Sequence, residues 1–117
     1  MQNYQGACHC GAIKFRFTAP TIEDGLRCNC SICVNKGALM SNFFIAPEDI
    51  QIDAEPDAVA TYQFDSHVAK HHFCKNCGIY TFHQTRRKPG FYRVNLGCVE
   101  GIDSLNLPVA WADGASF

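Results

Sequence analysis

The fold of this chain is decided by two short stretches, Cys8-His9-Cys10-Gly11 and Cys74-Lys75-Asn76-Cys77-Gly78. Cys-x-x-Cys-Gly is typical of a tight turn that points two sulfur atoms at one metal ion, with a glycine that lets the backbone approach them. In an extended Cys-x-Cys both side chains leave the same face of the strand, so Cys8 and Cys10 form the natural second pair. We expect these four cysteines to bind one ion that ties the N-terminal strand to a late hairpin. Such a site stabilises a fold by about 10 kcal/mol or more.

A third cluster, Cys28-Asn29-Cys30-Ser31-Ile32-Cys33, brings three more cysteines within a short segment. On a path from strand to turn, all three thiolates can face one ion and leave its fourth position open. A closed zinc site holds a fold together, whereas an open one can bind and activate a substrate thiol. The alternative is that another side chain closes this site, and the candidates are His67, His71, His72, His83 and Cys98.

Composition predicts one domain over residues 1–117, with the 47% apolar and 18% charged residues of an ordinary globular protein. The net charge of -1 provides no long-range field that would attract nucleic acid. The N-terminus lacks the segments of a signal peptide, and no apolar run approaches the roughly 20 residues of a membrane span. We therefore expect a cytoplasmic protein with no nucleic-acid or membrane partner, and the sequence leaves its oligomeric state open. In a reducing compartment, spaced cysteines are more often metal ligands than disulfides.

Short strands dominate the hydrophobic pattern. Ile13, Phe15 and Phe17 alternate with charged residues, which predicts a half-buried strand directly after the first cysteine pair. Further extended segments are expected at residues 39–45, 50–52, 59–64, 71–74, 79–84 and 91–95. A single helical turn is expected at residues 31–36, ended by Gly37. This pattern predicts a mostly-β protein of small coiled sheets around its metal, because the core of so short a chain is modest.

The order and spacing of seven cysteines resemble those of a known family, that of glutathione-dependent formaldehyde-activating enzymes, which also includes centromere-protein-V-like proteins. The resemblance extends from about Tyr4 to Asp103. Its motifs are Gly6-x-Cys8-x-Cys10-Gly11-x-Ile13, Cys28-x-Cys30-Ser31-x-Cys33, Phe73-Cys74-x-x-Cys77-Gly78, Asn95-Leu96-Gly97 and Gly101-x-Asp103. In addition, Asp113-Gly114 followed by Phe117 is similar to the end of the short family members.

The resemblance implies the Mss4-like fold, in which several small coiled antiparallel β-sheets surround zinc. It implies a carbon–sulfur lyase, similar to S-(hydroxymethyl)glutathione synthase, that adds glutathione or another thiol to formaldehyde or another small aldehyde. It also implies two Zn²⁺ ions per chain, a structural one on Cys8, Cys10, Cys74 and Cys77 and a catalytic one on Cys28, Cys30 and Cys33.

Two features concern how an anionic thiol would be bound. Family members often carry arginine directly after the third cysteine of the catalytic cluster, whereas this chain has Val34 there, with Lys36 nearby. Glutathione also brings two carboxylates, and the chain has one cationic run, Arg86-Arg87-Lys88. A solvated turn is the ordinary interpretation of such a run, and a carboxylate clamp is the alternative.

A second class of function follows from the fold resemblance alone: a non-catalytic zinc module that binds a protein partner. That function needs an exposed apolar patch, for which Leu39-Met40 and Phe43-Phe44 are the candidate stretch. A core strand is the ordinary interpretation of the same residues. Association with nucleic acid, suggested by the centromere-protein branch, would need a basic region that this sequence lacks.

Overall fold

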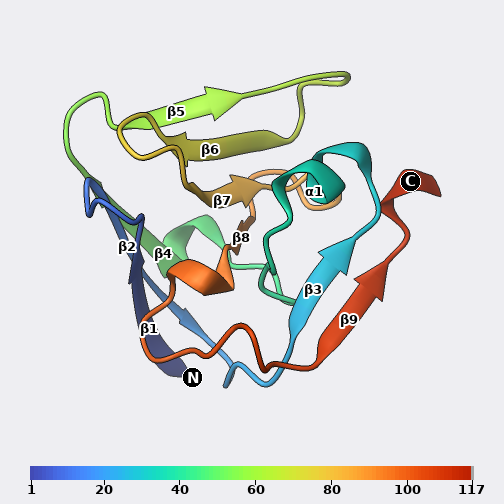
Figure 1. Ribbon diagram of the computed structural model, residues 1–117, viewed down its shortest axis with the longest axis horizontal. Coiled ribbons are helices and arrows are strands. Elements are labelled where there is room, and N and C mark those ends of the chain that lie inside the picture. Colours follow the sequence, from blue (N-terminus) through green and yellow to red (C-terminus); the bar gives the residue numbers. More distant parts are fainter. Residues whose placement is uncertain (117) are drawn as a thin grey trace.

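The computed structural model describes residues 1–116, so Phe117, the last residue of the family resemblance, lies outside the described part. Within that part the chain forms three small sheets, connected by short turns and helical segments (Figure 1). The strands are β1 (Gln2–Ala7), β2 (Ile13–Ala19), β3 (Gly25–Cys28), β4 (Ile50–Ala54), β5 (Val59–Tyr62), β6 (Lys70–Cys74), β7 (Tyr80–Gln84), β8 (Tyr92–Val94) and β9 (Val109–Ala112). The helical segments are α1 (Ser31–Lys36) and the 3-10 turns η1 (Pro47–Asp49), η2 (Leu96–Cys98) and η3 (Gly114–Ser116). The mostly-β prediction is confirmed.

The first sheet has the strand order β1-β2-β4 and is antiparallel throughout. In β2 the predicted alternation is observed, because Ile13, Phe15 and Phe17 are buried while the residues between them are exposed. The ring of Phe15 meets that of Phe82 edge-to-face at 5.6 Å. This aromatic contact joins the first sheet to the largest one, since Phe82 lies in β7.

The largest sheet has the order β5-β6-β7-β8 and is also antiparallel. Its strand β7 is buried on both faces, since Thr81, Phe82 and His83 are all buried in succession. Because neighbouring side chains on a strand point to opposite faces, Phe82 enters the core while His83 faces the other side of the sheet. The consequence is a buried histidine on the face away from the main hydrophobic core.

The third sheet pairs β3 with β9 in parallel, which the sequence pattern did not predict. Neither strand has a clear hydrophobic alternation, and Trp111 of β9 is 74% exposed. Gly25 opens β3 where a Cβ atom would collide with the side chain of Leu39, so the strand requires a glycine at that position. Figure 1 shows β9 beside β3. Because Cys28 ends β3 and pairs with Ala112, this pairing carries the C-terminal segment alongside the start of the middle cysteine cluster.

The apolar run at residues 39–45 is part of the core without forming a strand. Leu39, Met40 and Ile45 are buried, but the run makes only isolated bridges to its neighbours. The side chain of Ser41 accepts the N–H of Val94 at 3.1 Å, so a side chain replaces a ladder bond there. With Leu39 and Met40 buried, half of the candidate apolar patch is not available to a partner.

Helix α1 occupies the predicted residues and ends where expected. Gly37 follows it with φ of 67°, the left-handed conformation that glycine adopts without strain, and its N–H returns to the carbonyl of Cys33. No helix among residues 1–116 is long and apolar enough to cross a membrane.

Candidate metal centres and the adjoining pocket

The four flanking cysteines converge although they come from opposite ends of the chain. The sulfur atoms of Cys8, Cys10, Cys74 and Cys77 all lie within 4.8 Å of one another. The Sγ atoms of Cys8 and Cys10 are 3.6 Å apart, as are those of Cys10 and Cys74. A disulfide would require about 2.05 Å, whereas four sulfurs about 2.3 Å from a tetrahedral zinc ion are about 3.8 Å apart. The spacing therefore fits a metal site, and every cysteine is a free thiol.

Backbone N–H groups around the second pair favour the thiolate form. The N–H of Asn76 donates to the sulfur of Cys74 at 3.3 Å. The backbone N–H of Ile79 donates to Cys77 and is the main reason that the pKa of Cys77 is lowered to about 6. Gly78, with φ of 79°, makes this turn possible. Backbone N–H groups also lower the pKa of Cys74, but burial and the hydrogen bonds with Cys10 and Cys8 outweigh them and raise it to about 11. The turn therefore stabilises the thiolate form at Cys77 and not at Cys74.

The three middle cysteines also form a cluster, and their Sγ atoms lie within 4.8 Å of one another. Cys28 is the last residue of β3, Cys30 precedes α1 and Cys33 lies in the first turn of that helix. All three side chains are half-buried. Within residues 1–116 no histidine, carboxylate or fourth cysteine joins this set.

The other candidate ligands lie elsewhere. His67 is exposed in a loop, and His72 is hydrogen-bonded to Thr61 and Gln84. Cys98 is half-buried outside both clusters, on the side of the four-cysteine site, and burial raises its pKa to about 11. It is therefore a free thiol away from the three-cysteine cluster.

The C-terminal segment covers the three-cysteine cluster, which sequence reasoning missed. A Cβ atom on Gly114 would collide with the sulfur of Cys28, so the backbone there lies directly against the cluster. The side chain of Asn29 holds this segment in place: its Nδ2 donates to Asp113 at 2.9 Å, and its Oδ1 accepts the N–H of Ala115 at 2.9 Å. In the sequence, the Asp113-Gly114 pair indicates only the family resemblance.

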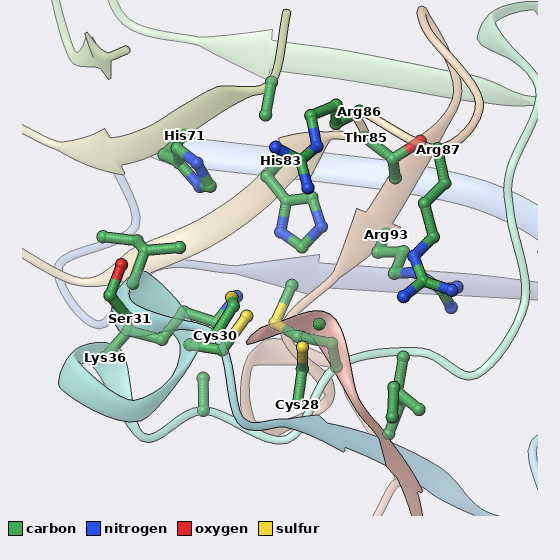
Figure 2. Close-up of a pocket in the computed structure, with 18 of the residues that line it drawn as sticks. Cys28, Cys30, Ser31, Lys36, His71, His83, Thr85, Arg86, Arg87 and Arg93 are labelled. Carbon is green, nitrogen blue, oxygen red and sulfur yellow. The ribbon is translucent and has the colours of Figure 1, made fainter. Parts of the chain in front are cut away.

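A pocket of about 710 Å³ lies between this cluster and the largest sheet (Figure 2). Four cationic side chains line it, Lys36, Arg86, Arg87 and Arg93, and among its lining residues Asp65 carries the one carboxylate. Arg86 and Asp65 are 4.0 Å apart, a long ion pair. The pocket wall is therefore predominantly positive beside a cluster of thiols, which suits an anionic ligand.

Lys36 rather than residue 34 faces the pocket. Val34 is 66% exposed, whereas Lys36 lines the pocket with its Nζ 4.4 Å from the ring centre of Tyr80 and 3.4 Å from its hydroxyl oxygen. Burial lowers the pKa of Lys36, and the neighbouring cysteines oppose that shift. Lys88, the end of the cationic run, instead lies over the ring of Phe91 at 4.2 Å.

Two buried histidines meet at one hydroxyl on the opposite wall of the pocket. His71 and His83 pair across β6 and β7, and the Tyr80 oxygen lies 2.7 Å from Nδ1 of His71 and 2.8 Å from Nδ1 of His83. Burial lowers the pKa of His71 to about 4 and that of His83 well below its usual value, so both rings are neutral. From the sequence, these histidines were predicted only as alternative metal ligands. No spacing in the sequence links them, because the register of β6 against β7 brings them together.

Together these features define a small β protein with two cysteine clusters suited to metal ions, one of which forms the base of a cationic pocket. The chain belongs to the family described as "Glutathione-dependent formaldehyde-activating enzyme", whose model matches residues 3–111. The resemblance expected from the cysteine pattern is therefore confirmed.

Two similar proteins agree with this assignment. A crystal structure of a Rhodobacter sphaeroides protein superposes with a TM-score of 0.81, at 35% identity over 92% of this chain and 99% of that one. A Halomonas elongata protein, provisionally named a glutathione-dependent formaldehyde-activating enzyme, is 30% identical over 79 residues. That match covers 62% of this chain and 50% of the relative, so the chain aligns with about half of the relative's length.

Proposed function

We propose that this protein is a carbon–sulfur lyase that reversibly adds a thiol such as glutathione to formaldehyde or another small aldehyde. The observation that carries the proposal is the set of three half-buried sulfurs on one wall of a cationic pocket, with no fourth protein ligand among the described residues. Membership of the family and the name of the Halomonas elongata relative support the same reaction class.

Zinc fits both clusters, because sulfur-only donor sets of this spacing suit Zn²⁺. We assign two ions per chain, a structural one to the four-cysteine cluster and a catalytic one to the three-cysteine cluster. When bound at the latter, zinc would stabilise a substrate thiol as its nucleophilic thiolate. The eight free cysteines support a reducing compartment, and we place the protein in the cytoplasm on that basis.

The protein's own side chains bind and orient the thiol substrate. Lys36, Arg86 and Arg87 offer charge-assisted hydrogen bonds to carboxylates, which favours a carboxylated thiol over a neutral one. In the addition, the sulfur electron pair forms the new C–S bond while the C=O π pair moves to oxygen. The proton that the thiol loses ends on that oxygen, so no oxidant or reductant is needed. A pocket of about 710 Å³ has the size of ordinary small-molecule sites.

The decisive experiment is titration of the cobalt-substituted protein with glutathione. We expect the ligand-field spectrum to change and saturate, and a thiol without carboxylates, 2-mercaptoethanol, to bind more weakly. Arg87→Gln should weaken glutathione several-fold and leave 2-mercaptoethanol unchanged. If no common thiol perturbs the cobalt spectrum, the proposal is wrong.

A further inference from the structure

The Tyr80 hydroxyl is shared by two imidazole rings and one ammonium group. Its oxygen lies 2.7 Å from His71 Nδ1, 2.8 Å from His83 Nδ1 and 3.4 Å from Lys36 Nζ. A hydroxyl has one proton and two lone pairs, and an ammonium group can only donate. Tyr80 therefore accepts from Lys36, donates to one histidine and accepts an N–H from the other. The two rings must be opposite tautomers.

The surroundings of His71 decide which tautomer each ring adopts. Nε2 of His71 is buried and has no hydrogen-bond partner, and the ring lies against Phe64 at 5.7 Å and Tyr62 at 6.4 Å. If Tyr80 donated to His71, that Nε2 would carry a buried N–H without an acceptor, which is rare and costly in proteins. The better arrangement is that His71 donates from Nδ1 and keeps a bare Nε2.

His83 then accepts the Tyr80 proton at Nδ1 and carries its own proton on Nε2. Its ring lines the pocket, and Figure 2 shows it pointing from β7 toward the cysteine cluster. The ring is neutral because burial lowers its pKa, so it offers one hydrogen-bond donor in a fixed direction. A donor that needs no rearrangement is what stabilises a developing negative charge.

We propose that His83 is a catalytic residue: its Nε2–H donates a hydrogen bond to the aldehyde oxygen that becomes negative as the thiolate adds, and Tyr80 is the positioning residue that fixes this tautomer. The inference rests on the proposed thiol-addition function. As the C–S bond forms, the C=O π pair moves to the oxygen facing His83. The oxygen receives the proton released by the thiol through pocket water, so His83 ends the cycle unchanged.

The tautomers can be measured without any assay of activity. In the zinc-loaded protein labelled with ¹⁵N-histidine, long-range ¹H–¹⁵N correlation spectra distinguish a protonated Nδ1 from a protonated Nε2. We expect the proton on Nε2 in His83 and on Nδ1 in His71. The reverse assignment would overturn the inference whatever the enzyme's substrate.

The catalytic role is tested by paired variants at His83. His83→Leu should lower kcat about 10²-fold to 10³-fold, the usual effect of removing one oxyanion donor. Glutathione affinity in the cobalt-substituted variant should stay within about twofold, since His83 acts on the aldehyde oxygen rather than the thiol. His83→Gln should recover much of the rate, because its amide nitrogen lies near the position of Nε2. Rates are taken above the uncatalysed background.

Tyr80→Phe tests the positioning role. It should lower kcat about 10-fold to 100-fold, the usual range for a residue that orients an active group, and should produce mixed tautomer signals at His83. Tyr92→Phe, in the neighbouring strand β8, is the matched control and should change neither. If the wild type binds no thiol, the proposed function fails. If the wild type turns over and a folded His83→Leu variant keeps its kcat, only this inference fails.

Discussion

At the scale of single residues, His71 shows how burial makes a side chain sensitive to acid. The ring is 5% exposed, and burial, assisted by the charge of Lys36, lowers its pKa to about 4. In the unfolded chain the pKa of histidine is about 6.5. The unfolded state therefore binds more protons between these values, and stability falls as the pH falls through this window. Above the unfolded pKa the contribution is complete and constant.

We therefore predict that His71→Gln reduces the acid sensitivity of the fold. Wild type should exceed the variant in free energy of unfolding most clearly near neutral pH. The difference should shrink below about pH 6.5 by at most about 1.4 kcal/mol per pH unit. Urea denaturation of the zinc-loaded proteins at several pH values measures it, and metal loss in acid cancels in the difference because both proteins keep every cysteine.

The control for that series is His67→Asn. His67 is exposed with φ of 60°, a conformation that asparagine tolerates. This variant should follow the pH dependence of the wild type. If the free energies of unfolding of the wild type and His71→Gln differed by the same amount at pH 7.5 and at pH 4.5, the neutral buried state of His71 would be contradicted.

The three-cysteine cluster and the histidine pair differ in how far the sequence could predict them. Cysteine spacing within each turn is local, so grouping Cys28, Cys30 and Cys33 needed no knowledge of tertiary structure. The link between His71 and His83 depends on the register of β6 against β7, which includes an irregularity after His72. A one-residue change of register would reverse which side chains face the pocket, so this part of the site was not predictable from spacing.

At the scale of elements, the predictable parts were those with local signals. Helix α1 was expected because Gly37 marks its end, and β2 because of its alternation. Strands β3 and β9 were missed because their stability comes from parallel pairing between distant segments, which leaves no local pattern. β1 was missed for a related reason, since most of its side chains are exposed and polar.

The pairing of β3 with β9 leads to a prediction about metal retention. Asn29→Ala removes both hydrogen bonds that hold the C-terminal segment over the three-cysteine cluster. We expect only a small loss of stability, because both hydrogen bonds are exposed, and faster transfer of one zinc equivalent to a coloured chelator. The other equivalent should leave at the wild-type rate, because the four-cysteine site lies elsewhere.

Asn106→Ala is the matched control for this experiment. It removes an exposed Asn–Asp hydrogen bond of the same kind, from Nδ2 of Asn106 to Asp103 at 2.6 Å, in the loop before β9. Both zinc equivalents should then leave at wild-type rates. If Asn29→Ala also released both zinc equivalents at the wild-type rates, the C-terminal segment would not protect the cluster.

At the scale of the whole molecule, the two clusters connect very different lengths of chain. Cys10 and Cys74, whose sulfurs are 3.6 Å apart, are separated by 64 positions. Their site joins the turn between β1 and β2 to the end of β6, and so joins two of the three sheets. The three-cysteine cluster joins only neighbouring residues at the end of β3 and the start of α1. A crosslink between distant segments restricts the unfolded chain more than a local one does.

This difference predicts opposite consequences for one serine substitution in each cluster. Cys74→Ser should unfold the domain or lower its melting temperature sharply, because binding at such a site is folding free energy. Cys30→Ser should keep the wild-type circular dichroism spectrum, lose one zinc equivalent and abolish the cobalt response to glutathione. Cys98→Ser, outside both clusters, is the control and should keep both metals. If Cys30→Ser and Cys74→Ser lost structure to the same degree, the division into a structural and a working site would be wrong.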